Sequence, residues 1–205
     1  MKVILASASP ARLRTLRDAG IEPQVRVADV DEDAILSRLR DSSFPDQVMA
    51  LASAKAREIA AAPGQLVIGA DSMLEVAGQL VGKPHTPQLA TQRIHQMQGK
   101  TAVLHTGHCV RLDIGGEIRE KTACSHAEIH FAEMSKAEIE AYVATGEPLE
   151  VAGSFTIDGL GGAFVESIVG DYHGVVGLSL PLLRQMVTDL GVSWPSLWNR
   201  ITVPD

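Results

Sequence analysis

Residues 67–84, VIGADSMLEVAGQLVGKP, hold an acid and a lysine on opposite legs of an expected hairpin. An apolar run leads into Asp71, the chain turns at Ala77-Gly78, and it returns to Lys83-Pro84. A carboxylate can hold a hard divalent cation, while an ammonium group neutralises the phosphate oxygens that the cation leaves uncovered. The pair therefore suits phosphate-ester chemistry, although a strand-end acid and a solvated hairpin lysine would give the same pattern.

The turn after the first expected strand is a second candidate site for an anion. A buried strand is expected over residues 3–7 and a helix over 10–19, and the turn between them carries Ser7, Ser9 and Arg12. Free backbone N–H groups and the positive end of the helix dipole attract anions at such a turn. Ordinary capping of the helix by Ser9, with Arg12 in solvent, would explain the same residues.

A lysine falls on the buried face of a longer helix, expected over residues 45–61. At about 3.6 residues per turn, one apolar stripe of this helix has Lys55 at its centre. The stripe is formed by Val48, Leu51, Ala52 and Ile59. A lysine in this position needs an anionic partner, which indicates a cation directed into a cleft; the alternative is a side chain whose stem covers the core while its charge reaches water.

These residues must be positioned by a fold in which strands and helices alternate. The pattern predicts a mixed α/β sheet flanked by helices, without internal repeats. The other expected elements are a strand over 24–29, a loop or short irregular helix up to Asp46, a helix from Thr86-Pro87 to Gly99, strands over 103–110, 111–120 and 123–131 with a turn at Gly115-Gly116, a helix from a Ser135/Glu138 capping box to Gly146, a glycine-rich loop over 158–162, a segment over 164–169 and a last helix over about 180–190.

Composition sets the class of protein and of partner. The chain has 205 residues, is 45% hydrophobic and carries a formal net charge of −7. It is long enough to bury a core as one α/β domain or two closely joined lobes. The negative charge and the lack of a basic run disfavour binding to nucleic acid or to an anionic membrane surface. We expect a small anion as partner rather than a large one.

The cysteines and the apolar runs bear on localisation. Cys109 and Cys124 lack the spacing of a zinc or redox motif, which favours a reducing compartment, with the cytoplasm as the default. The N-terminal apolar run is too short for a signal peptide, and no run approaches the ~18 apolar residues that span a bilayer. We therefore expect a soluble protein.

Three polar residues alternate along one expected strand. His126, Glu128 and His130 would share a strand face and could ligate a transition metal. The solvated face of an amphipathic strand is the better explanation, because the alternation itself predicts polar residues there. No serine lies in a nucleophile elbow, so covalent hydrolase chemistry is not favoured.

Seven blocks, in order, resemble the Maf family of nucleotide pyrophosphatases over nearly the whole chain. They are LASASPAR at 5–12, VDE at 30–32, LASAKA at 51–56, GADS at 69–72, GKP at 82–84, QGKT at 98–101 and GLGGAFVESIVGDYHGVVGLSLPLL at 159–183. The resemblance implies a single domain over residues 1–205. It also implies a two-lobed fold similar to that of house-cleaning inosine triphosphatases, with a cleft between the lobes.

The resemblance further implies an activity and roles for individual residues. The activity is that of a nucleoside triphosphate diphosphatase, which cleaves the triphosphate to monophosphate and pyrophosphate with Mg²⁺ or Mn²⁺, in house-cleaning or linked to cell division. The catalytic aspartate falls on Asp71, with Glu32 sharing the metal. Phosphate-binding cations fall on Arg12, Lys55 and Lys83, and the first-loop hydroxyls on Ser7 and Ser9. Sequence does not separate general base from metal ligand at Asp71.

The chain departs from the common family pattern at two positions. Ala11 stands where many members have an arginine, so a phosphate contact is missing or comes from Arg14. Asp158 stands where the dTTP/UTP branch commonly has glutamine. At both points the chain is more similar to the 7-methyl-GTP branch, with which it also shares residues 152–155, AGSF. A carboxylate can accept hydrogen bonds from a guanine edge, so Asp158 is the candidate base-reading residue.

Two other functions compete with the hydrolase. A nucleotide-binding regulator of septum formation would bind without turnover, whereas intact Asp71 and Glu32 favour the enzyme. A nucleotidyltransferase would need an early basic, glycine-rich signature that this N-terminus lacks. Family likeness also suggests a homodimer, in which Trp194 and Trp198 could form a contact or instead pack the tail onto the domain.

Overall fold

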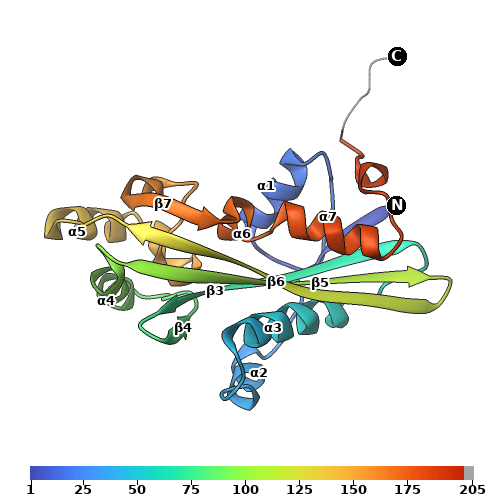
Figure 1. Cartoon of the computed structure of the whole chain (residues 1–205), viewed down its shortest axis with the longest axis horizontal. Coiled ribbons are helices and arrows are strands. Elements are labelled where there is room, and N and C mark those ends of the chain that lie inside the picture. Colours follow the sequence, from blue (N-terminus) through green and yellow to red (C-terminus); the bar gives the residue numbers. More distant parts are fainter. Residues whose placement is uncertain (201–205) are drawn as a thin grey trace. The chain divides into compact units, whose positions relative to one another are not determined.

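A computed structural model describes residues 1–200, whose strands form a seven-stranded mixed sheet (Figure 1). The strand order is β2-β1-β3-β5-β6-β7, with β4 pairing with β3. β1 is parallel to β2 and β3, whereas β4 is antiparallel to β3 and β7 to β6. The strands are β1 (Lys2–Leu5), β2 (Gln24–Val25), β3 (Gln65–Val76), β4 (Gln79–Val81), β5 (Thr101–Ile114), β6 (Glu117–Phe131) and β7 (Val165–Gly170). The predicted mixed α/β architecture is confirmed.

The helices begin where the sequence supplies capping side chains. Ser9, Thr86 and Ser135 each accept a backbone N–H at a helix start, and Ser135 and Glu138 form the expected capping box. The α-helices are α1 (Pro10–Asp18), α2 (Glu32–Arg38), α3 (Phe44–Glu58), α4 (Pro87–Met97), α5 (Lys136–Ala144), α6 (Tyr172–Val176) and α7 (Leu180–Asp189). The 3₁₀ helices are η1 (Glu147–Leu149), η2 (Ala152–Ser154), η3 (Leu160–Phe164) and η4 (Trp194–Leu197). None of the helices in residues 1–200 is long and apolar enough to cross a membrane.

The chain divides into two compact units, as the expectation of two lobes requires. The first unit comprises Met1–Asp71, Thr106–Ser125 and the described residues from Gly177 onward. The second comprises Ser72–His105 and His126–Val176. The cleft between lobes and the single domain over 1–205 stay predictions, and residues 201–205 lie outside the described part of the chain.

In the first unit, helices cover both faces of the sheet (Figure 1). Because successive side chains of a strand point to opposite faces, β1 directs Val3 and Leu5 to one face and Ile4 to the other. The first face packs against α1 and α7, and the second against α3. Trp194 packs against the first of these cores, whereas Trp198 is exposed. The tail therefore packs back onto the unit at Trp194.

α3 lies unusually close to the strands because two glycines face it. A Cβ atom on Gly69 of β3 would lie 2.3 Å from the carbonyl oxygen of Ala52, and one on Gly107 of β5 would lie 2.3 Å from that of Val48. Contacts this short do not occur, so any larger residue would displace the helix. The glycines thus fix the distance between α3 and the strands β3 and β5, and β3 carries Asp71.

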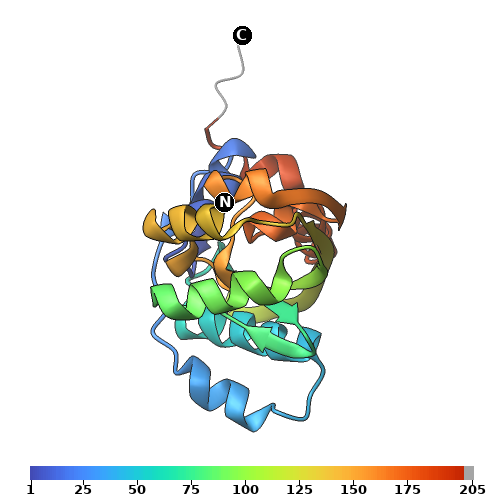
Figure 2. The ribbon, with the colours of Figure 1, turned by 90° about the vertical axis from the view of Figure 1, so that its left-hand side faces the viewer.

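The second unit has its own apolar core beneath α4 and α5, which contact each other and are seen together in Figure 2. The members of this core from the helices are Ala90, Ile94 and Met97 of α4 and Ile139, Tyr142 and Val143 of α5. The strands add residues that include Leu74, Leu104 and Ile129, and Phe155 packs edge-on against Phe131 with ring centroids 4.8 Å apart. The segment that carries Phe155 is therefore anchored to a packed core.

Two predictions of strand boundaries were wrong. Residues 103–131 form two long strands, β5 and β6, rather than three, because Arg111 does not interrupt β5. Its side chain donates to the carbonyl of Ala56 at 3.2 Å and pairs with Glu120 at 3.1 Å. The second strand covers only Gln24–Val25 instead of 24–29. The turns at Ala77-Gly78 and Gly115-Gly116 are confirmed, and all four residues have positive φ.

Candidate active site

A lysine bridges two carboxylates in the first unit. Lys55 Nζ lies 2.5 Å from Asp71 Oδ1 and 2.7 Å from Glu32 Oε1. The side chains of Lys55 and Asp71 are 12% and 11% exposed, whereas that of Glu32 is 48% exposed. The expectation that Lys55 needs an anionic partner is confirmed, and it has two.

The period of each element explains why these side chains meet. Along β3, residues 67, 69 and 71 share the face that packs against α3. Gly69 approaches the backbone of α3 at Ala52 and Ala56, and Lys55 precedes Ala56 directly. Asp71, the next residue on that face, therefore comes within reach of the lysine. Glu32 enters from the first turn of α2, capped by Asp31 and packed against α3.

Arg12 is buried in the first turn of α1 rather than solvated, so the alternative with Arg12 in solvent is wrong. Its Nε donates to the carbonyl of Gly177 at 2.8 Å and its Nη1 donates to Ser7 Oγ at 3.1 Å. Ser7 Oγ also accepts the N–H of Ser9 at 3.2 Å, and Ser9 Oγ accepts the N–H of Arg12 at 3.4 Å. One hydrogen-bonded group is therefore formed by Ser7, Ser9 and Arg12. Arg14, in contrast, lies exposed on α1.

Burial and charge oppose each other at this centre. Burial raises the pKa of Asp71, and Lys55 and Arg12 act in the opposite direction. Burial also lowers the pKa of the Arg12 guanidinium, against the attraction of Asp71 and Glu32. Arg12, Asp71 and Glu32 therefore influence one another electrostatically, and Lys55 contacts both acids directly.

The donor set suits a hard divalent cation. Asp71 and Glu32 offer carboxylate oxygens, the ligands that Mg²⁺ and Mn²⁺ prefer, and both point at one cationic atom, Lys55 Nζ. Mg²⁺ typically uses one or two carboxylates and completes its shell with water and phosphate oxygens. The pair therefore fits such a cation, although residues 1–200 hold no group of three or more His, Cys, Asp or Glu arranged as ligands. The same finding applies to His126, Glu128 and His130, whose strand face is exposed at His126 and Glu128.

The remaining two predicted site residues, Lys83 and Asp158, belong to the second unit. Lys83 is exposed, and its ammonium lies 3.9 Å from Glu150. Asp158 is exposed and accepts a hydrogen bond from the Thr156 hydroxyl. Their approach to Asp71 stays a prediction.

Sequence reasoning missed Glu147, which holds the glycine-rich loop in the second unit. Its carboxylate accepts the backbone N–H groups of Leu160 at 3.0 Å and Gly161 at 2.9 Å. A Cβ on Gly159 would lie 2.5 Å from this carboxylate, and one on Gly161 would lie 2.4 Å from the Tyr142 hydroxyl. The glycine run is recognisable in the sequence, but no local pattern shows that Glu147 binds the backbone of this loop.

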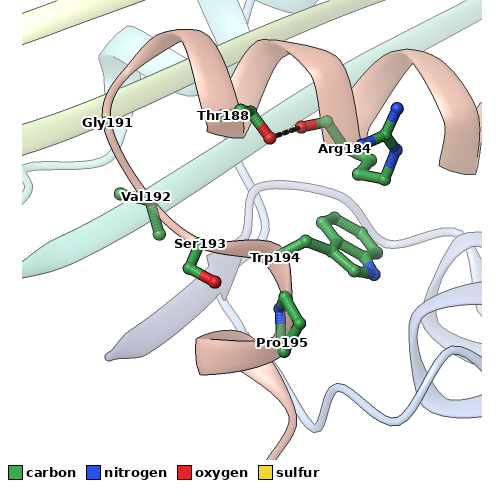
Figure 3. Close-up of a pocket in the computed structure, with 7 residues that line it drawn as sticks. All are labelled: Arg184, Thr188, Gly191, Val192, Ser193, Trp194 and Pro195. Carbon is green, nitrogen blue, oxygen red and sulfur yellow. Dashed lines mark hydrogen bonds between the residues drawn. The ribbon is translucent and has the colours of Figure 1, made fainter.

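A surface pocket of about 460 Å³ lies elsewhere in the first unit, at the C-terminal end of α7 (Figure 3). It is lined by Arg184, Thr188, Gly191, Val192, Ser193, Trp194 and Pro195. Thr188 donates to the carbonyl of Arg184 at 2.8 Å, as an ordinary helix contact. No predicted site residue lines this pocket.

The chain is similar to known proteins over nearly its whole length. A protein named nucleoside triphosphate pyrophosphatase from Nocardia farcinica is 52% identical over 96% of each chain. Proteins of the same name from Saccharopolyspora erythraea and Corynebacterium efficiens are 49% and 47% identical, covering 97% and 98% of this chain and 98% and 100% of theirs. The Staphylococcus aureus Ham1 protein aligns over 65% of this chain and 73% of its own, with TM-score 0.39 and 14% identity, a likeness too weak to carry a conclusion. The family model "Maf-like protein" matches residues 2–190. The chain belongs to the Maf family.

Proposed function

We propose that this protein hydrolyses nucleoside triphosphates to nucleoside monophosphates and pyrophosphate. The observation that carries the proposal is the pairing of Lys55 with both Asp71 and Glu32, next to the buried Arg12. Attack of water on the α-phosphorus builds negative charge on the leaving pyrophosphate. The reaction therefore needs a carboxylate that takes a proton from water or holds a metal ion, and cations that stabilise the departing oxygens. The relatives named nucleoside triphosphate pyrophosphatase support the same reaction.

Each residue of the centre takes a role in this reaction. Asp71 acts as general base or metal ligand, and Glu32 shares the metal with it. Ser7, Ser9 and Arg12 bind phosphate oxygens at the start of α1, where the free N–H groups of the helix point. Lys55 bridges the two acids and supplies a cation to the phosphates. Lys83 contributes a further cation to the triphosphate.

Asp71 and Glu32 would hold a Mg²⁺ or Mn²⁺ ion. When bound, such an ion supplies Lewis-acid polarisation of phosphate oxygens. Competition between Lys55 and a metal is then expected, because Lys55 already pairs with both carboxylates that would hold the ion.

Asp158 is our candidate for reading the base. An exposed carboxylate at the start of the glycine-rich loop can accept hydrogen bonds from the ring N–H and amino group of guanine, and it favours a cationic methylated base. Within this proposal 7-methyl-GTP is a better substrate than UTP or dTTP. The change Asp158→Asn should alter the ranking of the three triphosphates.

The setting of the enzyme is part of the proposal. Cys109 and Cys124 are both free thiols, which suits the reducing cytoplasm. A homodimer is proposed from family likeness, without a defined interface.

The test is the identity of the products from a panel of triphosphates. The panel contains 7-methyl-GTP, 5-methyl-UTP, pseudo-UTP, dTTP and the common nucleotides, each with Mg²⁺ or Mn²⁺ and compared by kcat/KM. We expect pyrophosphate and monophosphate from at least one of them. Release of inorganic phosphate and a diphosphate instead would contradict the proposed cleavage position, and tight binding without any release would favour the regulator.

A further inference from the structure

The segment that carries Lys83 is tied down on both sides by contacts within the second unit. Before the lysine, the carbonyl oxygen of Gly82 accepts two hydrogen bonds, from Arg93 Nη1 at 2.7 Å and from the N–H of Gly153 at 3.1 Å. After it, the N–H of His85 donates to the carbonyl of Leu149 at 3.2 Å. The backbone on either side of Lys83 is therefore fixed.

Both donors to Gly82 are themselves mounted on the core of the second unit. Arg93 lies on α4 directly before Ile94, which is buried in that core. Gly153 has φ of +70°, and a Cβ on it would lie 2.5 Å from the Leu74 side chain, so its backbone is pressed against β3. A hydrogen bond from a guanidinium is stronger than one between neutral groups. Arg93 is thus the main side-chain contact of this peptide.

The Lys83 side chain has weak contacts of its own by comparison. It is half exposed, and Glu150, its ion-pair partner, lies at 3.9 Å and is 71% exposed. Exposed pairs at such distances contribute little to the position of a long side chain. The point from which the lysine side chain leaves the chain is therefore set by the backbone that follows Gly82, and the carbonyl of Gly82 is held by Arg93.

We propose that Arg93 is a positioning residue for Lys83: by holding the carbonyl of Gly82, it fixes the peptide from which the lysine presents its ammonium to the phosphates of the bound nucleotide. The inference rests on the proposed function. Arg93 does not touch the nucleotide in this scheme and acts only through Lys83.

The experiment is a double-mutant cycle of Arg93→Ala and Lys83→Ala, read as kcat/KM for pyrophosphate release. We expect Arg93→Ala to lower kcat/KM about tenfold, mainly through KM, and Lys83→Ala to lower it at least as much. In the Lys83→Ala background, Arg93→Ala should change kcat/KM by less than about twofold, because there is no ammonium left to position. Arg93→Lys should recover part of the loss, since it keeps a charged donor.

Controls separate positioning from folding and from failure of the proposed function. Gln92→Ala, on the exposed side of the same helix, should leave kcat/KM unchanged, and the unfolding temperature of every variant is measured. An equal loss from Arg93→Ala with and without Lys83 would overturn the inference, as would wild-type kinetics in either single variant. Those results need an active wild-type enzyme; a wild type that releases no pyrophosphate overturns the proposed function and this inference with it.

Discussion

Asp71 and Glu32 pair with the same lysine, yet the fold holds them in different ways. Asp71 lies in the middle of β3, 8% exposed, on a strand with neighbours on both sides. Glu32 is the first residue of α2, a seven-residue helix without a single buried residue. The position of Asp71 follows from the packing of α3 on the sheet, whereas that of Glu32 depends on its ion pair with Lys55.

Asp71 is therefore held in place by the fold, whereas Glu32 can adjust. A carboxylate on a buried strand keeps its place whether or not a ligand is bound, so it suits a role that needs fixed geometry, such as orienting water. A carboxylate on a lightly packed helix can turn to whichever cation is present. We therefore expect Asp71 to carry most of the catalytic effect and Glu32 to tune it.

The largest effect should come from Asp71→Asn. The amide keeps the size of the side chain but is neither a base nor a good ligand for a hard cation, so kcat/KM should fall by about 10³-fold. Steady-state pyrophosphate release measures it, with the circular dichroism spectrum as control for folding. A variant within tenfold of wild type would show that Asp71 is not central.

Gly69→Ala tests whether the packing of α3 holds Asp71 in place. The added methyl group would meet the Ala52 carbonyl oxygen at 2.3 Å, so the helix must move, and the free energy of unfolding should fall by about 2–3 kcal/mol. Urea denaturation measures this change. Gly82→Ala is the matched control for stability, because its Cβ would meet nothing closer than 3.9 Å. Equal stabilities of the two variants would mean that α3 is not held by this contact.

Glu32→Gln should have a smaller effect on activity and almost none on stability. We expect kcat/KM to fall about tenfold, because one metal ligand is weakened while Asp71 keeps its place. The unfolding temperature should hardly change, since an ion pair with a half-exposed partner is worth at most about 1 kcal/mol. If Glu32→Gln proved as damaging as Asp71→Asn, the distinction between the two acids would be lost.

The smallest expected change is in the pH dependence of kcat/KM, which reports on the ionisation of Asp71. The proposed role of Asp71 requires its ionised form, and burial raises its pKa, so the acidic limb of the profile should lie above the ordinary aspartate value. Lys55 lowers this pKa, so Lys55→Met should move the limb to still higher pH in whatever activity is left. A limb that stays in place or moves down would contradict this assignment.

The sequence predicted those parts of the site that depend on local periodicity. The hairpin at Ala77-Gly78, the cap at Ser9 and the inward-facing Lys55 all follow from patterns within one or two elements. Contacts between residues far apart in sequence were not predictable in this way. Arg12 is buried because it donates to Gly177, which is 165 residues away, and no local pattern indicates that carbonyl.

The role of Gly69 also depends on a contact that the sequence does not show. Gly69 belongs to the GADS block at 69–72. The reason that a glycine is needed there is the close approach of α3, which is known only from the positions of both elements. Similarly, Glu147 and Arg93 look like ordinary polar residues of surface helices until the backbone groups that they hold are known. Chemistry-bearing residues could be found from type and spacing, whereas the residues that hold them could not.

A double-mutant cycle between Asp71→Asn and Glu32→Gln, read as kcat/KM for pyrophosphate release, tests whether the two acids serve one centre. If both acids serve one centre around Lys55, the double variant should be no worse than Asp71→Asn alone, within about threefold. A loss equal to the product of the two single losses would show that the two carboxylates act independently, and the shared centre would be wrong.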